Sequence, residues 1–482
     1  MLMSTKKLRG DGIFFTGKAS DDVTGSQYLV KFGGRQILLE CGLHQSSSNS
    51  YLDSYRINAE RFRFKPSEID YVFVAHAHID HCGLLPRLVK EGFRGKIIAT
   101  GTTAAVMKPL LLNSCYILND EARVLSKRYK RDYSPIYEEK DVYETLNLIY
   151  EFDEYDSVYN IDNIVSFQWL RNSHCIGAAQ LQLILTTDGK RRRILYTSDI
   201  GGLTTKNHYV QNTEIPGDFN DIVLLESTYG DAKRSICKTR EQDVKHLKSA
   251  IDTTLSRGGT AVLPCFSFSR TQEMLTTIYE IYGDDSSFIY PVVVDSKLSC
   301  DISELYSDLL FGEKLTLWEK VKKWGNVRFI SEKTDSQACL ADNRPKVIIS
   351  ASGFCTNGRV VNYLKKYLAD RNSMIIFSGY TGDNPSYLSY RIKNAKGHKY
   401  ISINKERVAN LADCITLSSF SSHAGHDDLV KFGSSLNCCK LILVHGDPES
   451  KKCLADRLKE TISKNNKTYR VLCAFRGMAV HL

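Results

Sequence analysis

Four residues with metal-ligand chemistry crowd into one short part of the chain. His76, His78, Asp80 and His81 follow the apolar segment 71–74, which predicts a buried strand. The carboxyl end of such a strand is where α/β proteins build their sites. Imidazole and carboxylate together suit Zn²⁺ or a similar first-row ion. Because His76 and His78 are one residue apart, they can share a metal, while Asp80 and His81 point elsewhere and can serve another.

Three more residues of this kind stand beside predicted strands. His174 lies between two strands, in the segment RNSHCIGAAQL, while Asp199 ends RRILYTSD and His445 ends the apolar stretch of KLILVHGD. Taken alone, His174 and Asp199 are more typical of polar loop residues. Asp199 gains weight because a carboxylate at a strand end can bridge two metals. Four such places in one chain predict a metal centre rather than a set of solvated loops.

Hydrophobic segments supply the elements that must hold these residues. The first 40 residues predict strands joined by glycine turns, and strands return at 164–170 and 181–199. From about residue 221, apolar β-branched strands alternate with helices, which is typical of a parallel, doubly wound sheet. Shorter units resume after residue 412. The pattern therefore predicts an α/β domain inserted inside another fold.

The composition is that of a globular protein and limits its setting. The chain has 482 residues, 42% hydrophobic and 25% charged, which excludes disordered and collagen-like classes. No apolar stretch reaches the roughly 18 residues of a membrane span, and the N-terminus has no signal-peptide core. The 14 cysteines include no CxxC pair, which indicates free thiols in a reducing cytosol. We therefore expect a cytoplasmic protein with no membrane partner. The net charge of +9 is only a weak sign of a polyanionic partner.

The order of these motifs resembles the β-CASP branch of the metallo-β-lactamase superfamily, and within it the RNA-processing nucleases such as ribonuclease J. The stretches that carry the resemblance span nearly the whole chain: HAHIDHCG, the His174 segment, YTSDIGG, LLESTYGD, LSSFSSHAGH and LVHGD. The resemblance implies an αββα metallo-β-lactamase sandwich with an inserted doubly wound α/β (β-CASP) domain. The sandwich is expected at 1–228 and 415–482, and the insert at 229–414.

The resemblance also implies two Zn²⁺ ions per chain and a ligand set for them. That set is His76, His78 and His174 for the first ion, Asp80, His81 and His445 for the second, and Asp199 as a bridge between them. No protein nucleophile is then needed, because a water held between two metals is acidified and attacks the phosphodiester.

Two further residues are implied to take part in the reaction. Glu226 matches the first β-CASP motif and His423 the second, with His445 as the third. His423 is expected to protonate the leaving ribose oxygen, and Glu226 to keep it charged and oriented. Asp80 is expected to orient or deprotonate the attacking water. A His at the third motif is typical of RNA-acting members, so RNA is the expected substrate, with 5′-phosphate and 3′-hydroxyl products.

These expectations describe a zinc-dependent ribonuclease that cuts single-stranded RNA, mainly endonucleolytically. One alternative is a 5′–3′ exoribonuclease of the ribonuclease J kind. Another is a catalytically weak RNA-binding or scaffold relative. One departure from the family pattern favours it, because Glu40 replaces the usual Asp of the first strand motif. Glu keeps the charge and adds a methylene, so we expect a tolerated change. The oligomeric state is left open, with a homodimer among the alternatives.

Weaker signals concern substrate binding. Arg270 opens a predicted helix, where it can meet an RNA phosphate or else brace the inserted domain. Arg359 ends the Gly-rich segment 352–359, whose glycines let a backbone approach RNA. Neither this segment nor 378–386 matches a nucleotide-binding P-loop, so no nucleotide cofactor is expected. His426 is expected as an exposed residue at a helix start, with phosphate binding as the alternative.

Overall fold

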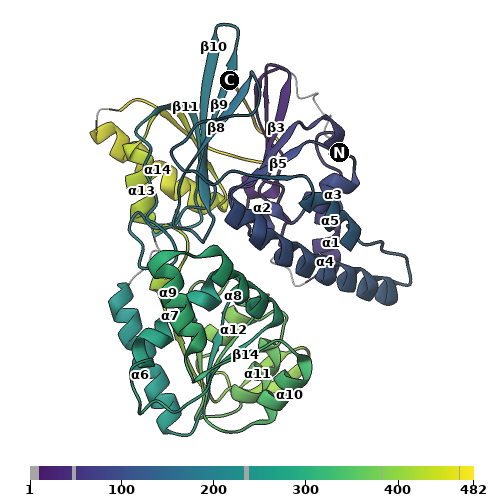
Figure 1. Ribbon diagram of the computed structural model, residues 1–482. Helices are drawn as coiled ribbons and strands as arrows, with labels where there is room; N and C mark the ends of the chain where they lie inside the picture. The colour runs from purple at the N-terminus through teal and green to yellow at the C-terminus, as the bar shows by residue number, and fades with distance from the viewer. Residues whose placement is uncertain (1–9, 46–49, 233–237, 383, 466) are drawn as a thin grey trace.

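The computed structural model describes residues 10–45, 50–232, 238–382, 384–465 and 467–482. Two sheets with helices outside them form the upper part of the molecule, and a separate α/β layer lies below (Figure 1). Within the described ranges, no helix combines the length and the apolar character needed to cross a membrane.

The first sheet of the sandwich has the strand order β22-β1-β2-β3-β4-β5-β6. Its strands are β1 Gly12–Phe15, β2 Tyr28–Phe32, β3 Arg35–Leu39, β4 Tyr71–Phe73, β5 Lys96–Ala99, β6 Ile149–Glu151 and β22 Ala479–His481. The pairs from β22 to β3 are antiparallel, and those from β3 to β6 are parallel. The carboxyl ends of β3, β4 and β5 therefore meet at one edge.

The second sheet has the order β21-β20-β11-β10-β9-β8-β7. Its strands are β7 Tyr159–Asn160, β8 Val165–Arg171, β9 Ala179–Thr187, β10 Lys190–Tyr196, β11 Phe219–Glu226, β20 Asn437–Val444 and β21 Arg470–Cys473. The strands from β10 to β21 run parallel, so β10, β11 and β20 also end side by side.

An apolar layer between the two sheets fixes how they face each other. Alternate residues point inward, such as Ile13 and Phe15 of β1 and Phe167 and Trp169 of β8, all of them fully buried. The ring of Phe73 meets that of Phe167 edge-on, with centroids 5.1 Å apart. Each such side chain contributes roughly 1.5–3 kcal/mol by its burial. The other face of each sheet packs against helices, which completes four layers.

The third sheet belongs to the lower part of the molecule and is parallel throughout, in the order β14-β13-β15-β12-β16-β19. Its strands are β12 Ala261–Pro264, β13 Val292–Asp295, β14 Val327–Ile330, β15 Val347–Ser350, β16 Met374–Phe377 and β19 Asp413–Thr416; β17 Tyr400–Ile403 and β18 Glu406–Ala409 form a hairpin beside it. The predicted doubly wound α/β insert is confirmed. The expected junction at 414–415 falls inside β19, which pairs with β16.

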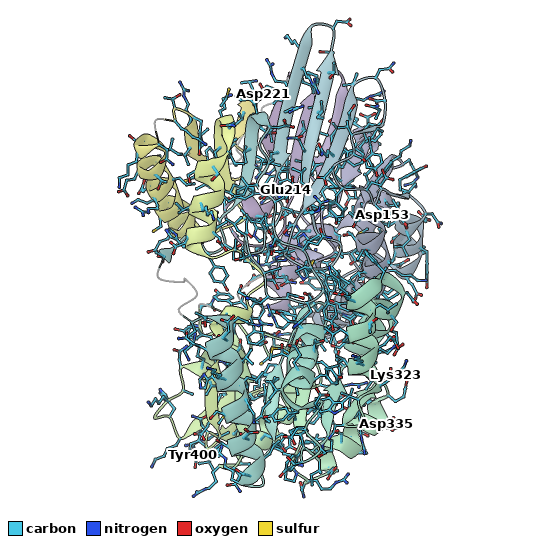
Figure 2. The ribbon with its side chains drawn as sticks, turned by 60° about the vertical axis from the view of Figure 1, so that its left-hand side comes forward. Asp153, Glu214, Asp221, Lys323, Asp335 and Tyr400 are labelled. Carbon is cyan, nitrogen blue, oxygen red and sulfur yellow. The ribbon has the colours of Figure 1, made fainter. Side chains whose placement is uncertain are left out.

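Helices cover the sheets and connect the strands. They are α1 Tyr51–Asn58, α2 Ile79–Cys82, α3 Leu85–Lys90, α4 Gly101–Tyr129, α5 Glu139–Leu146, α6 Arg240–Ser256, α7 Arg270–Tyr282, α8 Lys297–Leu309, α9 Gly312–Lys323, α10 Lys333–Ala341, α11 Val360–Tyr367, α12 Leu388–Lys393, α13 His426–Ser435 and α14 Pro448–Lys464. Helices α3, α4 and α5 pack on the first sheet, and α13 and α14 on the second. Charged side chains such as Lys323 and Asp335 project from the outer surface of the insert (Figure 2).

Candidate dinuclear metal centre

The turn after β4 is held in place by its backbone. The N–H groups of Cys41 and Leu43 donate to the carbonyls of His81 and Ile79, at 2.8 and 2.9 Å. Gly42 lies so close to this turn that a Cβ there would stand 1.6 Å from the carbonyl oxygen of Asp80. Only glycine fits such an approach. The turn and helix α2 are thereby pressed against the end of β3.

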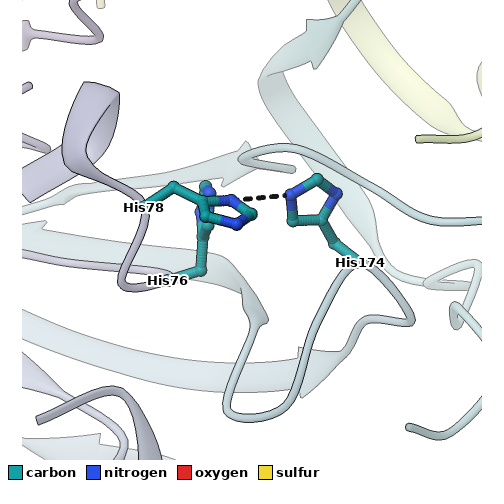
Figure 3. Close-up of side chains that lie close together, drawn as sticks. All are labelled: His76, His78 and His174. Atoms are coloured by element: carbon teal, nitrogen blue, oxygen red, sulfur yellow. Dashed lines mark hydrogen bonds between the residues drawn. The ribbon is translucent and has the colours of Figure 1, made fainter. Parts of the chain in front are cut away.

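Three imidazoles form the first cluster. The ligand-type atoms of His76, His78 and His174 all lie within 4.8 Å of one another. His174 Nε2 is 3.1 Å from His78 Nδ1 (Figure 3). The opposite nitrogens face protein partners: His174 Nδ1 is 3.2 Å from the carbonyl oxygen of Ser422, and His76 Nδ1 is 3.1 Å from Ser198 Oγ. These outer contacts aim the inner nitrogens of His76 and His174 at a common point.

The second cluster mixes imidazole and carboxylate. Asp80, His81, Asp199 and His445 also place their ligand-type atoms within 4.8 Å of one another. His81 Nε2 lies 3.3 Å from Asp199 Oδ2 and 3.4 Å from His445 Nε2. His445 Nδ1 lies 3.2 Å from Asp199 Oδ1 and 3.1 Å from Thr228 Oγ1, so Thr228 contacts the ring at the edge of the cluster.

Asp199 joins the two clusters. Its Oδ2 lies 3.8 Å from Nε2 of both His76 and His174, and 3.3 Å from Nε2 of His81. The side chain is 3% exposed. The structure therefore brings all seven sequence-predicted ligand residues into one buried site, with Asp199 between its halves.

The residues fit a pair of metal ions. Among the described residues, His76 Nε2 is buried and has no hydrogen-bond partner, although it points at His78, His174 and Asp199. A buried nitrogen without a partner, aimed at two other imidazoles and a carboxylate, is an arrangement that a cation stabilises. Nitrogen and carboxylate donors in this proportion suit Zn²⁺, and holding the far nitrogen of each imidazole is typical of metal sites.

The electrostatics of the two clusters differ. Burial lowers the pKa of His78 to about 4, and it lowers those of His76 and His174 well below the ordinary value. Burial opposes a charge on His81 as well, but Asp199 and Asp80 raise its pKa well above the ordinary value. The first cluster is thus neutral, and the carboxylates gather in the second.

Glu40 lies beneath the second cluster and is fully buried. Its carboxylate accepts hydrogen bonds from the Ala75 N–H and from Ser198 Oγ, both at 3.2 Å, and Oε1 lies 3.5 Å from His81 Nδ1. Burial raises the pKa of this carboxyl group. The longer side chain therefore still reaches the outer nitrogen of a candidate ligand.

Left-handed backbone conformations cluster around the same site. Glu40, Ser198 and His445 have φ values of 60°, 52° and 49°, which side chains other than glycine rarely adopt. Each costs on the order of 1–3 kcal/mol, and such positions gather at functional sites. Here they turn Asp199 and the ring of His445 into the cluster.

Glu226 and His423 form a pair beside the first cluster. Glu226 ends β11, is fully buried, and accepts from the N–H groups of Ile200 and Thr228 at 2.9 and 3.1 Å. His423 Nδ1 lies 3.0 Å from Glu226 Oε1. Burial disfavours a charged imidazole, but the Glu226 carboxylate outweighs it and raises the pKa of His423 to about 9. The His423 side chain is 23% exposed, so a substrate can reach it.

The two arginines expected to bind substrate both have protein partners in the structure. Arg270 is 7% exposed, and its guanidinium bonds Glu273 and Ser422. Of the two roles expected for Arg270, these contacts agree with bracing the inserted domain. Arg359 donates to Asp295 Oδ1 at 2.6 Å and to the carbonyls of Ile330 and Ser331.

The expectation of an exposed His426 is wrong. Helix α13 does begin at His426, but the ring is 7% exposed and its Nδ1 lies 2.9 Å from the carbonyl oxygen of Gly230. Sequence reasoning also missed Ser198, Thr228 and Ser422, each of which contacts a ring nitrogen of a candidate ligand. Their only signal is that each adjoins a motif residue in the chain.

An αββα sandwich with two adjacent groups of metal-ligand residues at one edge is typical of metallohydrolases. Profiles of three families match the chain in order: the metallo-beta-lactamase superfamily at 20–111, the Beta-Casp domain at 271–385 and the Zn-dependent metallo-hydrolase RNA specificity domain at 411–469. The chain belongs to the β-CASP branch of the metallo-β-lactamase superfamily.

Curated relatives match over most of the chain. Ribonuclease TTHA0252 of Thermus thermophilus is 28% identical, over 89% of this chain and 92% of the relative. Endoribonuclease YSH1 of Candida glabrata is 23% identical, over 97% of this chain but 58% of that protein's length. Transcription termination factor FttA of Methanocaldococcus jannaschii is 26% identical, over 95% and 70%.

A solved structure shares the fold. The crystal structure of a protein of unknown function from Enterococcus faecalis V583 aligns with a TM-score of 0.53 at 14% identity. The alignment covers 98% of this chain and all of the other, so the likeness extends over both parts of the molecule.

Proposed function

We propose that this protein is a zinc-dependent ribonuclease that hydrolyses phosphodiester bonds of single-stranded RNA, mainly within the strand. The observation that carries the proposal is the convergence of seven ligand-type residues with the Glu226–His423 pair in one buried site. Two relatives named as a ribonuclease and an endoribonuclease support RNA as the substrate. The His at position 445, typical of RNA-acting members of the branch, supports it as well.

The proposed ligands are those that the resemblance implies. His76, His78 and His174 would hold one Zn²⁺, Asp80, His81 and His445 the other, and Asp199 would contact both. When bound, such ions supply Lewis-acid stabilisation of charge on phosphate oxygens and acidify water at neutral pH. Asp80 is proposed to orient the attacking water, because its side chain is 18% exposed whereas the neighbouring ring of His81 is fully buried.

His423 is the proposed general acid. As water attacks phosphorus and the bond from phosphorus to the ribose O3′ breaks, O3′ takes up a proton. His423 Nε2 can give that proton, because Nδ1 is held by Glu226 at 3.0 Å. Glu226 is in turn fixed by two backbone N–H groups, so it orients the ring without leaving its place. The products are a 5′-phosphate and a 3′-hydroxyl.

The test combines a metal count with a cleavage assay. The purified protein is analysed for bound metals, and single-stranded RNA and DNA of the same sequence are labelled at the 5′ end or the 3′ end. About two Zn²⁺ per chain and internal cuts in RNA are the expected results. Mononucleotides released only from the 5′ end would replace the endonuclease with an exonuclease, a preference for DNA would change the substrate class, and metal with no cleavage would favour a scaffold.

A further inference from the structure

We propose that a buried triad of the inserted domain, Arg240–Glu273–Arg270, positions the two residues at the metal centre that face it, His174 and His423. The triad acts through the segment 418–423, which lies between the two parts of the molecule. The inference deepens the proposed function and rests on it for its kinetic readout, while its spectroscopic readout is independent of cleavage.

The triad consists of one carboxylate held between two guanidinium groups. Glu273 Oε2 lies 2.5 Å from Arg270 Nη1, and Glu273 Oε1 lies 2.8 Å from Arg240 Nη2. The side chains of Arg240, Glu273 and Arg270 are 12%, 5% and 9% exposed. All three come from the first turns of α6 and α7, so the two helix starts are locked together.

The triad and its neighbour Asp243 grip the segment 418–423 at three points. Arg270 Nη2 donates to Ser422 Oγ at 3.0 Å, and the Arg240 guanidinium carbon lies 3.4 Å from the centre of the Phe420 ring. On the same helix as Arg240, Asp243 Oδ2 accepts from the N–H of Ser419 at 2.8 Å. Hydrogen bonds and a cation–π contact thus fix both the backbone position of the segment and the orientation of its side chains.

The gripped segment touches the metal centre on its other side. The carbonyl oxygen of Ser422 is 3.2 Å from His174 Nδ1, and the next residue is His423. The rings of His174 and His423 lie with centroids 4.7 Å apart. Ser421 Oγ accepts from the His423 N–H at 3.3 Å and donates to Tyr229 OH at 3.2 Å. A shift of Ser422 therefore moves both imidazoles.

The segment needs such a brace because no sheet holds it. Backbone hydrogen bonds fix its flanks, from the N–H of Leu417 to Phe377 and from the N–H of Ala424 to Ile200, both at 2.7 Å. Between these points, the N–H groups of Ser419 and His423 donate to side chains, Asp243 and Ser421. Apart from the 3-10 turn Ser418–Phe420, side chains set the geometry of this stretch, and the triad supplies the largest of them.

Stability alone is a weak reason for the triad. Burying three charged groups costs desolvation, and apolar residues of the same volume often serve stability as well or better. What apolar residues cannot supply is a directed donor at Ser422. A lysine cannot supply it either, because a single ammonium does not span Glu273 and Ser422 as the fork of Arg270 does. The contact therefore points to positioning.

The test uses variants that loosen the grip without touching a candidate metal ligand. Ser422→Ala removes the hydroxyl that Arg270 contacts and keeps the carbonyl at His174. Arg270→Lys keeps the charge and loses the fork, and Arg270→Met loses both. Glu304→Gln is the matched control, because Glu304 forms an ion pair with Lys322 in the same domain, away from the segment. Thermal unfolding of each variant separates lost folding from lost positioning.

Two readouts are measured: kcat and KM on labelled single-stranded RNA, and the visible absorption of the Co²⁺-substituted protein, which reports the ligand geometry of the metal centre that includes His174. We expect Ser422→Ala and Arg270→Lys to lower kcat about 10-fold with KM within twofold, to keep the metal content and to shift the Co²⁺ band. Arg270→Met is expected to have the larger effect, and Glu304→Gln none.

Opposite results overturn the inference. An unchanged kcat and an unchanged Co²⁺ band in folded Ser422→Ala and Arg270→Lys would refute positioning. A higher KM with kcat unchanged would make Arg270 a substrate contact instead. If the wild-type protein does not cut RNA at all, the proposed function fails, and the Co²⁺ band still decides whether the segment orients His174. Should Arg270→Met fail to fold, Ser422→Ala decides the matter, because it leaves the triad whole.

Discussion

Two groups of buried polar residues lie at the ends of parallel strands in this molecule, one around Asp295 and the other at the metal centre. Their hydrogen-bonding atoms differ: those around Asp295 have protein partners, whereas an imidazole nitrogen at the metal centre has none. In the insert, Asp295 ends β13 and accepts from Arg359 at 2.6 Å, from Ser336 at 2.6 Å and from Tyr363 at 2.5 Å. At the edge of the sandwich, imidazole nitrogens face each other and a carboxylate, as in the pair His174 and His78 at 3.1 Å.

The difference separates structure from function. Around Asp295 each acceptor has a donor, and Arg359 supplies the compensating charge, so nothing further is needed there. At the sandwich edge, His76 Nε2 has no hydrogen-bond partner among the residues described. Buried polar atoms without partners are costly and call for an explanation, and a bound cation provides it. Burial and charge alone do not distinguish the two clusters, whereas the balance of donors and acceptors does.

The largest effect is expected at the residue that joins both halves of the metal centre. Asp199→Asn removes the negative charge shared by the two clusters, so the bound metal should fall below one ion per chain. RNA cleavage should fall by more than about 1,000-fold, because the metal chemistry is lost. Elemental analysis and the cleavage assay measure both. Asp188→Asn, in the exposed turn after β9, is the control, and full metal content in Asp199→Asn would contradict the bridging role.

The next effect separates chemistry from metal binding. His423→Ala should keep both metals and slow cleavage by about 100-fold, since it removes a proton donor and leaves the seven ligand residues in place. The same two measurements apply. His398→Ala, at an exposed turn of the insert, should match the wild-type protein. If His423→Ala instead strips the metal, His423 is a ligand and not the general acid.

The satisfied cluster should respond in stability and not in metal content. Asp295→Asn leaves the Arg359 charge uncompensated, so the insert should lose about 3 kcal/mol of unfolding free energy. Denaturant unfolding measures the loss, and elemental analysis should still find two metals. Loss of metal at unchanged stability would contradict the account, because it would make the Asp295 group part of the metal centre and not a structural one.

The smallest effect is expected at the departure from the family pattern. Glu40→Asp shortens a side chain that now contacts Ala75, Ser198 and the outer nitrogen of His81. Because the left-handed backbone at Glu40 is unchanged, Zn²⁺ affinity should change by less than about 10-fold. A competition titration with a zinc-binding dye measures it. A large gain in Zn²⁺ affinity and in RNA cleavage would mean that Glu40 weakens metal binding and activity in this protein.

The sequence revealed those site residues whose chemistry can be recognised from the amino-acid type alone. His76, His78, Asp80 and His81 are adjacent in the chain, so their chemistry was visible without a fold. The partners Ser198, Thr228 and Ser422 were not, because a hydroxyl or a carbonyl oxygen acquires its role only from the atom that faces it. His426 was misjudged for the same reason: helix α13 was predicted, but not that Gly230 would cover its start.

The fold divides in a similar way. Apolar runs such as that of β12 and its neighbours predicted the doubly wound sheet, because parallel strands are buried on both faces. The charged, Tyr-rich sequence of 115–160 predicts a helical arm over a sheet edge, whereas β6 near its end joins the first sheet beside β5. A short strand, half exposed at a sheet edge, has no periodicity to reveal it. Long buried elements were therefore predictable, and edge elements were not.

The central claim is that the unsatisfied cluster holds two metals on which RNA cleavage depends. Its most direct test is to titrate metal-free protein with Zn²⁺ while following the cleavage of labelled single-stranded RNA. The account predicts no cleavage at the start, a rise on addition of metal, and a plateau at about two equivalents per chain. Full cleavage by the metal-free protein, or Zn²⁺ binding elsewhere that Asp199→Asn leaves intact, would contradict it.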